Sequence, residues 1–496
     1  MSRAWPLALA VALTGVVYVP VTQNYFFADD FLHLFAIANG DLVRFLLEPF
    51  GGHVYLVRNL VYALCYAAFG IHAAPYLWLA LLTHLVNVAL LCHVVQLATA
   101  SSRLALVAAT AWGICPFHAE PVGWYAVYGQ LLIGTILLSV LARLLVTARD
   151  GVVVDMPTAA VWYALVLAAA TCWGVGIGIA CVFPLVALLV LPPRLRPRRV
   201  MMLFLSLPVV VVALYVVVNA VYVLGYGGSV RSVAYSVGTL RFAEPLVRMV
   251  AYLVGTGMAA LVAGFVVPAA ALRGTPALVG LLLLATAVAG AAARGSRGER
   301  RTLLALALLP LAAYGMIAIG RAHIALAFGE SLVEAATVPR YHYVGSLGLT
   351  LLAGVVLTRL DDRWVHAPGW VKSAAVALWL VLATAAYVRR GAFIDHHVRD
   401  RMATEGVLTA IHAAVAAAPA GAPVYIENRP FTPVLFLVTP AKGFPGWAAI
   451  FLIAYRDVAL DGRRVYFVER SPEVLATAAR GGRIAALLVP ATDRGS

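Results

Sequence analysis

The sequence predicts a polytopic α-helical membrane protein with about 11 transmembrane helices and a small C-terminal α/β domain. Hydrophobic residues make up 63% of its 496 residues, whereas charged residues make up only 12%. The mean hydropathy of +0.92 excludes a soluble globule. Apolar runs of about 20 residues recur through the first 390 positions.

The candidate spans are long apolar runs with few charges. They are residues 5–22, 75–98, 104–117, 130–147, 158–173, 176–192, 201–223, 276–293, 302–319, 341–358 and 370–388. Segment 54–69 is short and carries Arg58, so we expect a helix lying at the membrane interface. Segment 242–271 could cross once, but a single crossing would reverse the side of the arginines at 294–301. We therefore expect it to re-enter the membrane or lie along the outer face.

Arginines predict the orientation of these spans. The net charge of +14 is almost wholly arginine, because lysine occurs only at Lys372 and Lys442. With a cytoplasmic N-terminus, most arginine clusters fall on the cytoplasmic side, as the positive-inside rule requires. These clusters are Arg103, Arg143 and Arg149, the 194–199 loop, the 294–301 loop, and Arg359 and Arg363, whereas Arg389 and Arg390 are the exception. We therefore predict a multi-pass inner (plasma) membrane protein with its chemistry on the outer face.

Several classes of protein are excluded by composition. Short arginine clusters between apolar runs do not form the continuous basic face, interleaved with aromatics, that nucleic-acid binding needs. The five cysteines lie in apolar segments without a C-x-x-C pair, which argues against a disulfide framework or a thiolate zinc site. The apolar stretch after Arg3 lacks a small-x-small cleavage site, so we expect an uncleaved first span.

The tail changes character and predicts a second domain. We divide the chain into a transmembrane domain, residues 1–390, and a small soluble α/β domain on the outer side, residues 391–496. The spacing of apolar residues predicts a helix over 398–418 and another over 472–480. Short apolar runs at 424–426, 465–468 and 484–489 predict buried strands.

Asp29 and Asp30 stand directly after the first span, among aromatic and aliphatic residues. Adjacent carboxylates resist desolvation, so an apolar chain carries them where they are solvated, paired or bound to a cation. One could take a proton from an acceptor hydroxyl while the other helps to hold a divalent cation against a phosphate. The alternative is an ordinary aspartate pair at a helix end.

Two further outer segments carry candidate residues. His118 and Glu120 could complete a metal site or orient an acceptor, and the alternative is a helix-end pair satisfied by water. Arg340 stands between Pro339 and Tyr341, where its planar, permanently charged fork suits a phosphate. An arginine snorkelling within a tyrosine belt is the alternative there.

Three other patterns are weaker. Gly174-Val-Gly-Ile-Gly178 looks like a phosphate loop, but it follows an apolar helix and lacks the acidic follower, so we predict close helix packing. The pairs His396-His397 and Asp361-Asp362 lie at segment ends, and we assign them no function.

Several stretches together resemble the GT-C glycosyltransferases, in particular the bacterial relatives of protein O-mannosyltransferases that use polyprenyl-phosphate sugars. The order and spacing agree over residues 20–360. The stretches are Asp29-Asp30; Gly52-His53, Arg58-Asn59 and Tyr62; Phe69-Gly70; Thr83-His84 and Asn87; His118, Glu120, Trp124 and Gly129; and Pro339-Arg340-Tyr341 with Gly345 and Gly348.

The resemblance implies an inverting glycosyltransferase whose first outer loop carries the catalytic aspartate and whose donor enters from the bilayer. At matching positions it implies Asp29 as the base. It implies acidic partners or ligands of a divalent cation, Mg or Mn, at Asp30 and Glu120, with His118 beside them. This chain departs from many relatives at Gln130, where an acidic residue is expected.

The resemblance also implies partners. The donor phosphate would lie near four residues: Arg340, Arg58, His53 and Tyr341. The expected partners are a polyprenyl-phosphate-linked sugar, membrane lipids, and an acceptor that is a protein, a polysaccharide or a lipid, with no nucleic acid. Which sugar moves, which acceptor receives it and whether a metal is needed stay open.

Two readings from other classes compete with an enzyme. A membrane transporter or lipid flippase would place ionisable residues at mid-span depth and would show an inverted repeat. The charges gather instead at the outer boundary, and no repeat stands out. A non-catalytic assembly partner would tolerate the loss of Asp29, Asp30 and Arg340.

Overall fold

The structure is a computed structural model of the 496-residue chain. It describes residues 5–26, 42–47, 53–70, 72–221, 243–265, 267–327 and 331–365, together with strands 424–428, 465–469 and 485–487. Single positions between these ranges are also described, including Asp29, Asp30 and His33. The predicted helices 398–418 and 472–480, and residues 222–242 between α11 and α13, lie outside the described residues.

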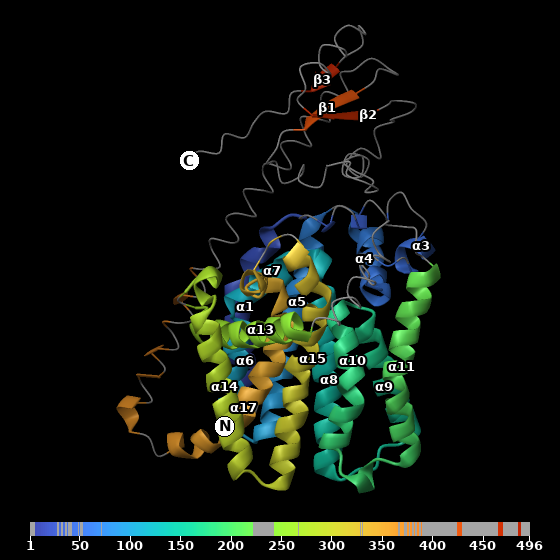
Figure 1. The fold of residues 1–496 in the computed structure, drawn as a ribbon. Coiled ribbons are helices and arrows are strands. Elements are labelled where there is room, and N and C mark those ends of the chain that lie inside the picture. The colour runs from blue at the N-terminus through green and yellow to red at the C-terminus, as the bar shows by residue number, and fades with distance from the viewer. Residues whose placement is uncertain are drawn as a thin grey trace.

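The described part is a bundle of helices with short connections (Figure 1). The first half contains α1 (Trp5–Tyr18), η1 (Val19–Gln23), α3 (Leu42–Leu47), α4 (Leu56–Phe69), α5 (Ala73–Thr99), α6 (Ser102–Gly113), η2 (Pro116–His118), α7 (Ala119–Gly123), η3 (Tyr125–Val127) and α8 (Gly129–Asp150). The second half contains α9 (Met156–Ala170), α10 (Gly174–Val190), η4 (Pro193–Leu195), α11 (Arg198–Val221), α13 (Ala243–Ala263), η5 (Ala269–Leu272), α14 (Thr275–Arg294), α15 (Arg297–Ala327), α16 (Leu332–Ala335), η6 (Pro339–Tyr341) and α17 (Tyr343–Val365).

The prediction of a polytopic helical membrane protein is confirmed. Seven helices of the described residues are long and apolar enough to cross a membrane, and shorter apolar helices accompany them. Each predicted span from 5–22 to 341–358 coincides with a helix. The predicted span 370–388 is described only at scattered helical positions.

The helix ends follow from local sequence. The side chain of Ser101 accepts a hydrogen bond from the amide of Leu104 and begins α6, and Asp155 does the same for Thr158 in α9. Helix α15 extends beyond the predicted span 302–319 and continues to Ala327. No proline or glycine interrupts residues 321–327, and Gly329, with φ of 72°, follows them.

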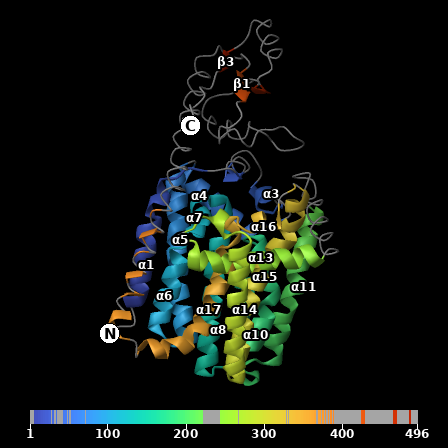
Figure 2. The same ribbon diagram turned by 60° about the vertical axis from the view of Figure 1, so that its left-hand side comes forward.

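Segment 243–263 forms a helix that differs in direction from its neighbours. In both ribbon views α13 lies across the upright helices α14, α15 and α17 (Figures 1 and 2). This direction agrees with the expectation that the segment does not make a simple crossing. The same views place α3, α4 and α7 at one end of the bundle, which we call the site end.

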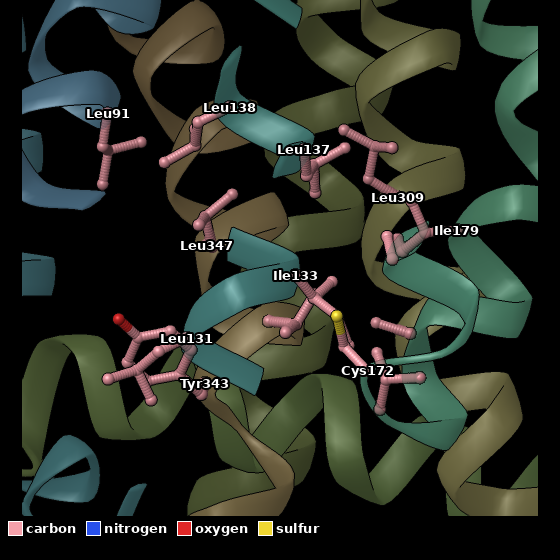
Figure 3. Close-up of a cluster of buried hydrophobic side chains, with 14 of the residues drawn as sticks. Leu91, Leu131, Ile133, Leu137, Leu138, Cys172, Ile179, Leu309, Tyr343 and Leu347 are labelled. Atoms are coloured by element: carbon pink, nitrogen blue, oxygen red, sulfur yellow. The ribbon is translucent and has the colours of Figure 1, made fainter. Parts of the chain in front are cut away.

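Helix α8 occupies the centre of the bundle. In Figure 3 its Leu137 points toward Leu309 of α15, and its Leu138 points toward Leu91 of α5. Between apolar helices in lipid, close packing rather than exclusion from water holds such contacts together. A side chain added at Gly178 of α10 would strike the backbone of Ala312, so the predicted close helix packing of the 174–178 glycines is confirmed.

The predicted strands of the tail are also present. β1 (Val424–Asn428), β2 (Val465–Glu469) and β3 (Ala485–Leu487) form a parallel sheet in the order β2-β1-β3. Val424 is opposite Val465 on one side and Ala485 on the other. Parallel strands need crossover connections, as expected for an α/β unit.

Candidate active site

Asp29 lies at the site end, in the segment that follows η1. Burial raises the pKa of its carboxyl group, and the positive charges of Arg340, Arg58 and Arg321 oppose that rise. Among the described residues, the Asp29 carboxylate makes no hydrogen bond or ion pair. A partly buried carboxylate of raised basicity, not consumed by a protein partner, is suited to accept a proton.

The charges of three arginines from distant parts of the chain act on Asp29. They come from α4, α15 and η6, and each acts on the Asp29 pKa through its charge. The charge of Arg340 acts on Asp29 more strongly than that of Arg58 or Arg321.

Arg340 is held by Glu120 of α7. Its guanidinium Nη1 donates to Glu120 Oε1 at 2.6 Å, and its backbone N–H donates to Glu120 Oε2 at 3.1 Å. The side chains are 29% and 14% exposed, so solvent screens this ion pair only in part. The guanidinium also lies over the rings of Trp124 and Tyr341, at 5.2 and 5.3 Å. Glu120 thus fixes the direction of Arg340.

Gln130 at the start of α8 supports the same segment. Its side-chain Nε2 donates to the carbonyl oxygen of Arg340 at 2.6 Å. An acidic side chain at position 130 could not make this bond in its ionised form. The departure from the acidic residue expected by resemblance therefore has a structural role here.

Asp30 and Arg58 are buried beneath Asp29. Asp30 is 1% exposed, and the Tyr62 hydroxyl donates to its Oδ1 at 3.2 Å. Arg58, also 1% exposed, donates from Nη1 to the carbonyl of Ala126 and from Nη2 and Nε to Asn59 Oδ1. His33 Nε2 lies 3.0 Å from Arg58 Nη1. Arg58 supplies positive charge to the site while protein groups occupy its donors.

His53 contributes a neutral ring to the site. Its ring stacks on Trp173 with centroids 6.1 Å apart, and it lies 5.6 Å from the ring of Tyr55. Burial, with smaller effects from Arg321 and Arg58, lowers the pKa of His53 to about 3. His53 is therefore uncharged near neutral pH, and it can offer a phosphate a hydrogen bond but no cationic charge.

Arg321, in the last part of α15, is a residue that our sequence reasoning missed. Its guanidinium lies 5.7 Å from the ring centre of Tyr341, the same ring that Arg340 covers. Within the described part of the chain, Arg321 makes no hydrogen bond and no ion pair with a carboxylate. By contrast, the exposed Arg248 and Arg273 each pair with a glutamate, as does the partly exposed Arg340.

A signal in the sequence could have identified Arg321. The positive-inside rule accounts for the arginines at the opposite end, but it leaves the arginines at the site end unexplained. An arginine at that end without a nearby acidic residue in the sequence is a candidate for an anionic ligand.

His118 belongs to a second, buried network rather than to the Asp29 site. Its Nε2 lies 3.2 Å from Ser346 Oγ, to which the indole N–H of Trp112 donates at 3.0 Å. In the same cluster, His84 Nδ1 lies 2.8 Å from the Tyr343 hydroxyl. These bonds join α5, α6, η2 and α17, and so anchor the segments that precede Glu120 and follow Arg340.

The candidate metal ligands do not form a cation site. Across the described residues, no group of three or more His, Cys, Asp or Glu side chains is placed to hold a metal ion. Both oxygens of Glu120 accept hydrogen bonds from Arg340, and His118 packs against Trp112 at a ring distance of 4.6 Å. The residues Asp30, Glu120 and His118 therefore do not fit a divalent cation, and we derive no step through one.

No family model matches the chain, and no curated protein matches it. Several solved structures match the chain, and two of them are described here. ArnT from Cupriavidus metallidurans, bound to undecaprenyl phosphate, is 16% identical over 98% of this chain and 90% of that chain, with a TM-score of 0.48.

The second is the Archaeoglobus fulgidus oligosaccharyltransferase tethered to an acceptor peptide with the NVT sequon. It is 10% identical over 92% of this chain and 68% of that chain, with a TM-score of 0.45. At these scores and identities we transfer no residue role from either structure, and the function proposed below depends on the chain's own residues.

Proposed function

We propose that this chain is an integral-membrane inverting glycosyltransferase that moves a sugar from a polyprenyl-phosphate donor to an acceptor hydroxyl. The observation that carries the proposal is a carboxylate, Asp29, on which the charges of three arginines act, two of them, Arg321 and Arg340, lying over the same Tyr341 ring. A base for a hydroxyl proton and cations for a phosphate are the two requirements of such a transfer. The resemblance of residues 20–360 to GT-C enzymes supports the same class.

The proposed reaction transfers one proton to Asp29 and releases polyprenyl phosphate. The acceptor oxygen attacks the anomeric carbon, and its proton passes to the Asp29 carboxylate. The bond between that carbon and the phosphate oxygen breaks, and the polyprenyl phosphate leaves with both bonding electrons. Attack opposite the leaving group inverts the configuration at the anomeric carbon.

The arginines serve the departing phosphate. A phosphodiester carries one negative charge, and the phosphate monoester that leaves carries a second, so positive charge stabilises the transition state more than the bound donor. Arg321 has unused N–H donors, and we assign it the main phosphate contact. Arg340, aimed by Glu120, is its partner, while Arg58 acts from beneath through its charge.

The other assigned residues have positioning roles. The Tyr341 ring lies against both Arg321 and Arg340 and fixes their spacing. The Tyr62 hydroxyl holds Asp30, so we assign Asp30 to the shape of the loop that carries the base. His53, neutral and stacked on Trp173, offers a hydrogen bond to a phosphate oxygen or to a sugar hydroxyl.

The test is donor consumption by purified protein in lipid nanodiscs. Polyprenyl-phosphate sugars of several kinds are supplied with candidate acceptors, and free polyprenyl phosphate is measured. Asp29→Asn removes the base and should reduce transfer by about 10²–10⁴-fold. Asp150→Asn, an exposed aspartate at the opposite end, is the matched control.

The results separate the competing functions. Transfer by Asp29→Asn at the wild-type rate would show that Asp29 is not the base. Movement of intact donor across the bilayer, without release of polyprenyl phosphate, would favour the lipid flippase or transporter instead.

A further inference from the structure

Two arginines at the end opposite the site converge on a single carbonyl oxygen. Arg196 donates from Nη1 to the oxygen of Leu188 at 2.8 Å, and Arg301 donates from Nη2 to the same oxygen at 2.7 Å. Arg196 follows η4, whereas Arg301 belongs to the first turns of α15. The loops that follow α10 and α14 lie together at this end in both ribbon views (Figures 1 and 2).

Helix capping explains one of these bonds but not both. Leu188 lies in the last turn of α10, where backbone carbonyls lack helical partners and carry partial negative charge. One guanidinium is enough to give the Leu188 carbonyl a hydrogen-bond donor. The second guanidinium places two positive charges close together, which is unfavourable. Burial and the charge of Arg301 lower the pKa of Arg196, as expected for cations held close to each other.

Among the described residues, no salt bridge offsets these two charges. Neither Arg196 nor Arg301 forms an ion pair with an acidic residue within the described part of the chain. Arg300 shows the ordinary alternative, because it donates to the carbonyls of Ala293 and Gly295 and so caps the end of α14. Arg196 and Arg301 are half-buried, whereas Arg300 is exposed.

The groups around Arg196 and Arg301 suit a lipid headgroup, because free N–H donors lie next to exposed apolar side chains. Each guanidinium has five N–H groups and uses one nitrogen on Leu188, so both retain donors for an oxyanion. One turn farther into the membrane, Leu185 of α10 and Leu304 of α15 are 47% and 54% exposed. A phosphate held by the arginines would place its acyl chains along these apolar side chains.

We propose that Arg196 and Arg301 together bind the phosphate of an anionic phospholipid in the leaflet at this end of the bundle. The site is independent of the glycosyltransferase proposal. The bound lipid would join α10 to α15 by neutralising the two charges that meet between them.

The test compares lipid retention by native mass spectrometry. Full-length protein is reconstituted with phosphatidylglycerol or with phosphatidylcholine, and retained lipids are counted. We expect wild-type protein to retain phosphatidylglycerol preferentially and Arg196→Gln/Arg301→Gln to lose that preference. Each arginine removed should weaken binding about fivefold. The control is Arg194→Gln/Arg198→Gln, two exposed arginines of the same region, which should bind as wild type does.

Further measurements keep the proposal falsifiable. If the double variant does not fold, the single variants and the shift in Tm that phosphatidylglycerol gives wild-type protein replace it. Equal lipid retention by wild type and the double variant would overturn the proposal, as would an equal loss in the control. Added inorganic phosphate should leave the bound lipid in place. Displacement of the lipid by inorganic phosphate would assign the site to the free anion instead.

Discussion

The Glu120 carboxylate binds Arg340 through both of its oxygens, one on the guanidinium and one on the backbone N–H. These residues are 220 positions apart in the chain. The contact ties α7 to η6, and it leaves Glu120 without an oxygen that is free of protein bonds. Glu120 therefore orients the arginine, a role different from the cation ligand that the sequence led us to expect.

Glu120→Gln should lower both stability and transfer. The substitution keeps the shape but removes the charge that opposes Arg340. A fully buried pair broken in this way costs about 3–5 kcal/mol, and partial exposure here reduces the expected cost to about 1–3 kcal/mol. Thermal unfolding and donor turnover measure the two effects. Glu334→Gln, which breaks the exposed pair with Arg273, should change both by little. Equal effects of the two substitutions would contradict the role of Glu120.

Arg321→Gln should move the acidic limb of the pH profile to higher pH. Burial raises the pKa of Asp29, and the charge of Arg321 lowers it. Removing that charge raises the pKa of Asp29 further, so the base is protonated over a wider acidic range. The measurement is kcat/KM for donor consumption against pH. Arg248→Gln, which removes an exposed arginine paired with Glu244, should leave the limb in place. An unchanged acidic limb in Arg321→Gln would show that the charge of Arg321 does not influence the base Asp29.

Chelation should leave transfer intact. Both Glu120 oxygens are bonded to Arg340, and the described residues bring no three metal-binding side chains together. The check is donor turnover after EDTA treatment and after return of Mg²⁺ or Mn²⁺. Loss of turnover with EDTA and recovery with either cation would show that the site takes up a metal after rearrangement of Glu120.

Gly178→Ala should destabilise the bundle. The added Cβ would strike the backbone of Ala312 and the side chain of Met316, forcing α10 and α15 apart. Overpacking of this kind costs about 1–3 kcal/mol. Gly290→Ala in α14 is the control, since its Cβ would meet no atom within 4 Å. Thermal unfolding of both variants in the same detergent decides between them, and an unaltered Tm for Gly178→Ala would contradict the close packing.

Much of the fold could be predicted because each span is recognisable from its own residues. Apolar runs locate the helices, and the arginine clusters at 194–199 and 294–301 mark the ends of α10, α11, α14 and α15. The short apolar runs of the tail likewise predicted strands at 424–426, 465–468 and 484–489, and the structure has them at 424–428, 465–469 and 485–487. Such signals are local, so they require no knowledge of which helices touch.

The site could be predicted only in part because its bonds join distant positions. Asp29 and Arg340 were found from their residue types and their place at the membrane boundary. The pairing of Glu120 with Arg340 depends on how η6 packs against α7, which no local pattern encodes. Arg321 was missed for a related reason: Arg273 is paired with Glu334, 61 positions away, and sequence alone does not tell which arginine has such a partner.

The long separation between Glu120 and Arg340 also orders events during synthesis. Asp29, in the first loop, is synthesised early, whereas η6 is synthesised only after α15. A chain released by the ribosome before residue 340 would carry the base without its oriented cation. On the proposed chemistry, incomplete chains could not transfer sugar, and activity would arise only after η6, near the start of the last third of the polypeptide, has been made.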